Sequence, residues 1–113
     1  MKDTITKRFQ ELVEQGQQLV GHMNKDAYYV SAHDIPLFQA WLSSVSNILE
    51  TASPPNSFFL NEAKRLMTNE EMKFSISTGV VSKMLGLLQS AQQEWVKGLL
   101  RKIEYILAAE TFD

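Results

Sequence analysis

The stretch Gly79-Val80-Val81-Ser82-Lys83-Met84-Leu85-Gly86-Leu87-Leu88-Gln89-Ser90-Ala91-Gln92-Gln93-Glu94-Trp95-Val96 carries the pattern that decides the fold. Its apolar residues recur at intervals of three and four, which is the period of an α-helix. The pattern continues past this stretch, so we predict one helix from Gly79 or Val80 to Ala109. Such a helix would be roughly 45 Å long, and we expect it either to bend or to project from the domain.

The apolar side of this helix is broad. It comprises Val80, Val81, Met84, Leu85, Leu87, Leu88, Ala91, Trp95, Val96, Leu99, Ile103 and Ile106. These positions span roughly half of the helix circumference, whereas a surface helix needs only a narrower stripe. The helix is therefore either the central one of a bundle or part of an oligomer interface. Gly86 and Gly98 are the places where it could bend or be approached closely.

Three other segments also show helical periodicity. We predict helices over residues 3–23, 34–51 and 58–67,. Pro36 suits the first turn of the second helix, where no hydrogen bond is needed from its nitrogen. The pair Pro54-Pro55 separates the second helix from the third, and Asn56 or Ser57 can cap the start of the third.

Gly16 lies in the middle of the apolar stripe of the first helix. Glycine inside a helix is less favourable than alanine by about 0.5–1 kcal/mol. Two interpretations are open at this position. Either another helix crosses closely here, or the glycine is merely tolerated.

Residues 24–33 lack the helical period and are predicted to form a loop. Within it, Tyr28 and Tyr29 either anchor the loop by packing or form a stacking platform for a ligand. Further along, Thr68 and Glu71 have the spacing of a capping box, with Thr68 as the N-cap of a short helical turn.

Residues 72–78 alternate between apolar and polar side chains, which is also the pattern of a β-strand,. One strand alone would have no partner, so we predict an ordered loop instead. Its apolar residues Met72, Phe74 and Ile76 are expected to point into the core.

Together these segments predict an all-α fold, a small bundle of about four helices with a long C-terminal helix. The 113 residues fit one helical domain over 1–113, either a stand-alone protein or the N-terminal module of a longer one,. The hydrophobic fraction of 44% and the charged fraction of 21% are ordinary for a globular chain, so wholesale disorder is not expected,.

Charge and composition argue against several classes of function. The net charge of −2 does not provide the basic surface that nucleic-acid binding requires, so no nucleic-acid partner is expected,. The absence of cysteine excludes disulfides, thiolate zinc sites and thiol nucleophiles,. No apolar run is long enough to span a membrane, and no signal peptide is recognisable. We therefore expect a cytoplasmic protein without a membrane partner.

The chain also lacks recognisable catalytic motifs. Its two histidines, His22 and His33, are not near a G-x-S-x-G sequence and do not form a metal-binding spacing such as H-E-x-x-H,. His33 and Asp34 are adjacent, but no third metal ligand lies near them in the sequence. We accordingly predict no enzyme activity, no metal and no cofactor. Trp41 and Trp95 lie on apolar stripes, where core packing is expected ahead of a pocket.

Four stretches give the chain a family resemblance: RFQELVEQGQQL at 8–19, LFQAWLSSVSNIL at 37–49, EWVKGLL at 94–100 and AAETFD at 108–113. In this pattern it resembles the N-terminal helical region of bacterial abortive-infection or phage-defence proteins, some of which continue into an HEPN-like domain. The resemblance implies a non-catalytic N-terminal module or a stand-alone protein of that shape. It does not imply ribonuclease activity, because Arg8, Arg65 and Arg101 lack the following histidine of HEPN ribonucleases.

The leading functional prediction is a non-catalytic protein-interaction or self-association domain, because the last helix is half apolar. Its partner would be another protein or a second copy of the chain. The predicted contact residues are Leu85, Leu88, Trp95, Val96, Leu99 and Ile103. The alternative is a regulator that binds a small ligand between its helices. Tyr28, Tyr29, Trp41 and Trp95 would line that pocket.

Overall fold

The computed structural model describes residues 2–68, 72 and 75–100 of the chain. The described part contains four α-helices and one short 3₁₀-helix. They are α1 (Lys2–His22), η1 (Ala32–Asp34), α2 (Ile35–Ala52), α3 (Phe58–Met67) and α4 (Thr78–Lys97). The predicted all-α bundle is confirmed, and the helix boundaries of the first three predicted segments are within a residue or two of those observed.

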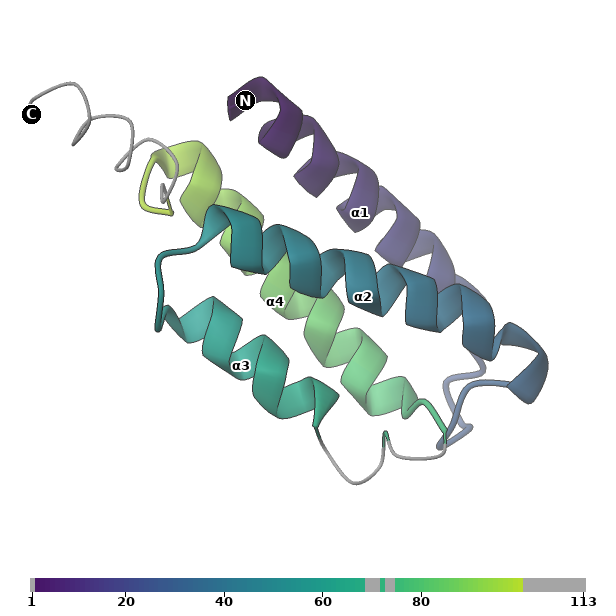
Figure 1. The fold of residues 1–113 in the computed structure, drawn as a ribbon. Coiled ribbons are helices and arrows are strands. Elements are labelled where there is room, and N and C mark those ends of the chain that lie inside the picture. The colour runs from purple at the N-terminus through teal and green to yellow at the C-terminus, as the bar shows by residue number, and fades with distance from the viewer. Residues whose placement is uncertain (1, 69–71, 73–74, 101–113) are drawn as a thin grey trace, which may run out of the picture.

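The four α-helices run alternately up and down the bundle, and α4 lies at its centre (Figure 1). α4 contacts α1, α2 and α3, whereas α3 reaches the rest of the bundle mainly through α2 and α4. Eight residues of α4 are buried: Val80, Val81, Met84, Leu85, Leu87, Leu88, Ala91 and Trp95. The broad apolar side of this helix is therefore explained by its central position within one chain.

Gly16 marks a close crossing of three helices. A Cβ atom built on Gly16 would lie 2.4 Å from Cζ2 of Trp41 on α2 and 2.9 Å from Cδ1 of Leu85 on α4. The missing side chain also lets the buried Trp41 indole donate a hydrogen bond to the Leu12 carbonyl oxygen, at 2.9 Å. Of the two interpretations of Gly16, the close crossing is thus the one observed.

The N-terminal part of α1 is joined to α4 through Trp95. The indole N–H of this buried residue donates to the hydroxyl oxygen of Thr6 at 2.8 Å. Its ring also packs against Phe9, with 6.1 Å between the ring centroids. Trp41 and Trp95 are each 1–2% exposed, so the expectation that both belong to the core is confirmed.

The last helix ends at Lys97 and does not continue to Ala109 as the periodicity predicted. Gly98 adopts the left-handed conformation, with φ of 85°, and its N–H bonds back to the Glu94 and Trp95 carbonyls. The Leu99 N–H bonds to the same Glu94 carbonyl at 2.8 Å, which completes a Schellman-type helix end,. Glycine is favoured here because other residues are strained at this φ. By contrast, Gly86 faces open space, so no close approach occurs there.

The segment before α4 pairs with the loop between α1 and α2, a contact that the sequence did not predict. Tyr29 and Ser77 form an isolated antiparallel β-bridge. The Val30 N–H donates to the Ile76 carbonyl at 2.9 Å, and the Thr78 N–H donates to the Tyr28 carbonyl at 3.0 Å. Ile76 is buried and Met72 partly buried, as expected for this loop, while Phe74 lies outside the described residues.

Serine side chains cap two helices. Ser57 accepts a hydrogen bond from the Leu60 N–H at the start of α3, and Ser77 accepts one from the Val80 N–H at the start of α4. Thr68 has a different role from the one predicted. It follows the last residue of α3, where its hydroxyl donates to the carbonyls of Lys64 and Arg65, so it belongs to a helix C-terminus. Glu71 lies outside the described residues.

Candidate functional site

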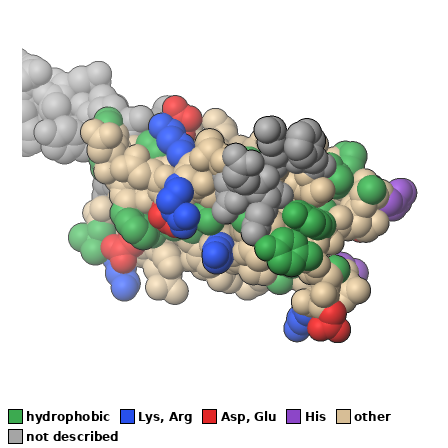
Figure 2. Space-filling model, turned by 90° about the horizontal axis from the view of Figure 1, so that it is seen from below, with side chains coloured by type: hydrophobic (Ala, Val, Ile, Leu, Met, Phe, Trp, Pro, Cys, Tyr) green, Lys and Arg blue, Asp and Glu red, His purple; other side chains and the backbone are tan. Residues whose placement is uncertain are grey.

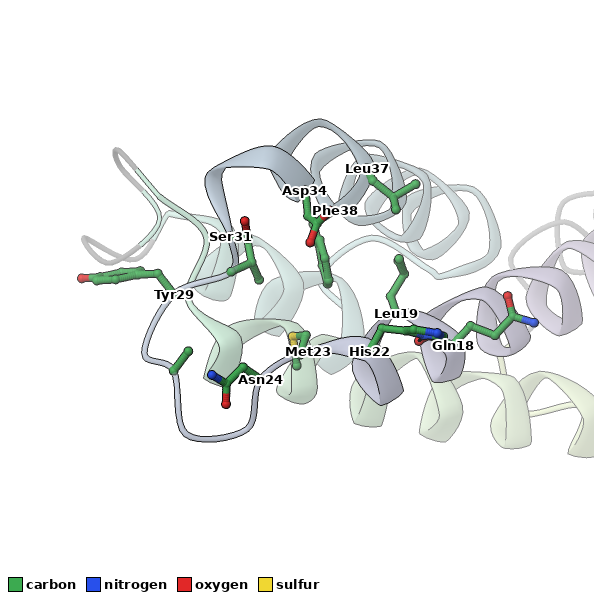
Figure 3. Close-up of a pocket in the computed structure, with 12 residues that line it drawn as sticks. Gln18, Leu19, His22, Met23, Asn24, Tyr29, Ser31, Asp34, Leu37 and Phe38 are labelled. Carbon is green, nitrogen blue, oxygen red and sulfur yellow. Dashed lines mark hydrogen bonds between the residues drawn. The ribbon is translucent and has the colours of Figure 1, made fainter.

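A cleft of about 690 Å³ opens at the end of the bundle where α1 ends and α2 begins (Figure 3). Its apolar lining consists of Leu19, Met23, Ala27, Val30, Leu37 and Phe38. Its polar lining consists of Gln18, His22, Asn24, Tyr29, Ser31 and Asp34. Two smaller hollows, of about 420 and 280 Å³, lie along α2. The cleft is therefore the candidate site that we develop.

The floor of the cleft is part of the hydrophobic core. Leu19, Val30 and Phe38 are buried, and Met23 packs partly buried against them. Leu37 differs because it is 50% exposed although it lines the same cleft. An apolar group entering the cleft would thus contact a preformed surface and cover Leu37 as it did so.

The loop that forms one wall is held in place from the start of α4. The hydroxyl of Thr78 donates to the Ala27 carbonyl at 2.8 Å, and the β-bridge fixes Tyr29 opposite Ser77. Tyr28 and Tyr29 contact each other edge to face, with 5.0 Å between their ring centroids. They are 63% and 44% exposed, but only Tyr29 lines the cleft. Tyr29 therefore stands at the edge of the cleft, on a loop that contacts the start of α4, and Tyr28 packs against it.

Asp34 occupies the N-cap position of α2 without capping it. Its backbone has φ of −94° and ψ of −6°, and its side chain makes no capping hydrogen bond. The usual N-cap residue has an extended backbone that brings its oxygen to the helix N–H groups. Figure 3 shows Asp34 and Phe38 projecting from the start of α2 toward the side of the cleft that carries Leu19 and Met23.

His22 has one ring nitrogen committed to the backbone. Its Nδ1 lies 2.7 Å from the Gln18 carbonyl oxygen. A carbonyl oxygen only accepts, so Nδ1 is the donor, and Nε2 is the ring nitrogen left to bond another group. Within the described residues, no hydrogen bond joins the side chains of His22, Ser31 and Asp34 to one another.

The residues predicted to form an interaction surface do not share one surface. Leu85, Leu88 and Trp95 are buried between helices of the same chain, where another molecule does not reach them. Val96 and Leu99 are 66% and 70% exposed at the end of α4, which is the end of the bundle away from the cleft. Ile103 lies outside the described residues.

The residues predicted to line a ligand pocket are also divided. Tyr29 lines the cleft, but Trp41 and Trp95 are core residues, and Tyr28 is not among the lining side chains. Sequence reasoning considered His22 and Asp34 only for catalysis, metals or helix ends. It did not predict that Leu19, Met23 and Phe38 form the floor of a cleft. Apolar periodicity shows which side of a helix faces the core, but it does not show that residues at one end of that side remain accessible to a ligand.

Charged side chains on the face formed by α3 and its neighbours are mixed in sign (Figure 2). Lysine and arginine side chains lie beside aspartate and glutamate there, and the visible histidine atoms lie at the cleft end. On α3, Arg65 pairs with Glu62, and this hydrogen bond lowers the pKa of the Glu62 carboxyl. In this view there is thus no large surface of one sign.

Within residues 2–68, 72 and 75–100, no group of three or more histidine, cysteine, aspartate or glutamate side chains is placed to hold a metal ion. Among these residues, no helix combines the length and apolar character needed to cross a membrane. No known protein family, curated protein or solved structure matches the chain.

Proposed function

We propose that this chain is a non-catalytic protein-interaction domain that receives its partner in the cleft between the end of α1 and the start of α2. The observation that carries the proposal is the combination of a preformed apolar floor with exposed Tyr29 and Leu37 at its edge. Protein interfaces are enriched in tyrosine and gain most of their energy from side chains buried in such hollows.

The cleft supports this proposal better than the surface first expected on α4. Only Val96 and Leu99 of that predicted set are exposed among the described residues. Single exposed apolar side chains are common on proteins and need no partner to explain them. The cleft instead brings apolar and hydrogen-bonding groups together in one concave site.

Site-specific photo-cross-linking in cells compares the two surfaces directly. A photoreactive phenylalanine analogue replaces Leu37 in one variant and Val96 in the other, and both positions are exposed in the free protein. We expect a discrete adduct from the Leu37 position and little or none from Val96. An adduct with twice the mass of the chain would identify self-association, and any other mass would identify a different partner.

An adduct from the Val96 position alone would overturn the proposal and return the interaction surface to the end of α4. The absence of an adduct from Leu37 would overturn it as well. Both variants are first compared with the unmodified chain in thermal unfolding, so that a loss of adduct is not confused with a loss of fold.

A second candidate function is a regulator that binds a small ligand in the same cleft. The specific observation in its favour is the volume of about 690 Å³, which falls within the range of roughly 300–1,000 Å³ typical of small-molecule sites. Thermal-shift screening against a metabolite library tests it, because a ligand of the folded state raises the melting temperature. The cytoplasmic location and the resemblance to phage-defence proteins stay predictions from the sequence.

A further inference from the structure

We propose that the cleft recognises a cationic amine carried on an apolar body. The inference rests on the proposed function, because it names the chemistry that the cleft would select in its partner. The amine could be a lysine side chain of a protein or a free small amine, and the experiment below separates these two sources.

The Asp34 carboxylate makes no capping hydrogen bond at the start of α2. Its backbone conformation keeps it from capping α2, and Pro36 in the first helical turn has no N–H to offer,. No ion pair between described residues includes Asp34, so its carboxylate has no cationic partner among them. A half-buried carboxylate without a partner favours a cation that enters beside it.

The charged and polar groups around the cleft also favour a cation over an anion. The described lining residues include no lysine or arginine, so an anionic ligand would meet Asp34 without a compensating charge. Nδ1 of His22 is bonded to the Gln18 carbonyl, so Nε2 is the ring nitrogen that remains for a ligand. A group that donates several hydrogen bonds and carries a positive charge matches this arrangement, and an ammonium group has both properties.

The cleft also has an apolar floor beside these polar groups. Leu19, Met23 and Phe38 provide an apolar surface next to Asp34 and His22. A lysine side chain likewise has an apolar and a charged part. Its methylene stem packs on apolar groups while its ammonium reaches a polar partner. A small ion such as ammonium would leave that floor uncovered, which is why we assign an amine with an apolar body.

The experiment records backbone amide NMR shifts while matched probes are added to the protein. The free probes are phenylbutylamine and its neutral counterpart phenylbutanol. The peptide probes are acetyl-leucyl-lysyl-leucine amide and the same peptide with norleucine in place of lysine. We expect the amine members to shift amides between residues 18 and 38, and the neutral members to bind at least about tenfold more weakly.

Two variants with the same change of charge complete the test. Asp34→Asn should weaken binding of the amine probes by on the order of tenfold, because a charge-assisted hydrogen bond is lost. Asp26→Asn should leave binding unchanged, since Asp26 is exposed in the loop between α1 and α2 but does not line the cleft. Binding of the peptide alone points to a protein partner, and binding of phenylbutylamine alone points to a small amine.

Equal binding of the neutral and amine probes would overturn the amine inference while leaving the cleft as a binding site. Unchanged affinity in Asp34→Asn would also overturn it, as would the absence of any shift from both amine probes. Because the cross-linking comparison of Leu37 and Val96 uses no amine, its result separately decides the proposed function.

Discussion

Replacing Gly16 by alanine tests the packing that brings α1, α2 and α4 together. The added Cβ would lie 2.4 Å from Cζ2 and 2.9 Å from Cε2 of Trp41, and 2.9 Å from Cδ1 of Leu85. Carbon atoms in contact are normally about 3.5–4.0 Å apart, so the closest pair overlaps by about 1 Å. The Trp41 ring is buried and bonded to the Leu12 carbonyl, so it cannot withdraw without losing that bond.

Two contributions lower the free energy of unfolding of Gly16→Ala, and a third raises it. Overpacking a core costs about 1–3 kcal/mol, and a weakened indole hydrogen bond costs about 1 kcal/mol more. The better helix propensity of alanine returns about 0.5–1 kcal/mol. Gly16→Ala should therefore destabilise the protein by about 1–3 kcal/mol, measured by urea unfolding, and lower its Tm by on the order of 10 °C.

Gly86→Ala is the matched control, because Gly86 is also inside a helix but a Cβ there meets nothing within 4 Å. It should stabilise the protein by about 0.5–1 kcal/mol through helix propensity alone. If Gly16→Ala stabilised the protein by the same amount as Gly86→Ala, the close crossing would be refuted.

Three further predictions concern single contacts. Thr6→Val should destabilise by about 1–3 kcal/mol in urea unfolding because the buried Trp95 N–H loses its acceptor, whereas Thr6→Ser should retain most of the stability,; equal stabilities would contradict this role. Gly98→Ala should cost about 1 kcal/mol because φ is 85°, and Gly98→Asn should cost less,; the reverse order would count against the helix end described. The hydrogen bond from Arg65 lowers the pKa of Glu62 in the folded protein. Their pairing therefore stabilises the fold at pH values above the pKa that Glu62 has in the unfolded chain, and this stabilisation is lost as the pH falls through the lower pKa of the folded protein. The Tm difference between the protein and Glu62→Gln should accordingly be small and should shrink on acidification, and a difference that grows in acid would oppose it.

Helices were predictable from the sequence wherever a local signal agreed with apolar periodicity. The Pro54-Pro55 pair and Ser57 fix the gap before α3, and the observed helix has the predicted range of 58–67. Gly98 was predicted as a place where the helix bends or is approached closely, because glycine is compatible with both helix interiors and helix ends. Its left-handed conformation decides the outcome, and no pattern of apolar residues reports a backbone angle.

Contacts between distant segments were not predictable in the same way. Residues 72–78 were predicted to have no partner strand, yet Ser77 pairs with Tyr29. This pairing holds the loop that forms one wall of the cleft. The half-apolar α4 suggested an interface because sequence alone does not distinguish a helix covered by its own chain from one covered by another. Three helices of this chain cover it, so most of its apolar residues are buried and only Val96 at its C-terminal end is a large exposed apolar residue among them.

The most direct test of the account is to block the cleft and measure the cross-linked adduct formed from the Leu37 position. Ala27 lines the cleft, so Ala27→Trp should occupy part of its volume, while Ser90→Trp places the same ring on an exposed part of α4. We expect Ala27→Trp to abolish the adduct and Ser90→Trp to leave it intact, with both variants folded by circular dichroism. An adduct of unchanged yield in Ala27→Trp would contradict the claim that the partner enters this cleft.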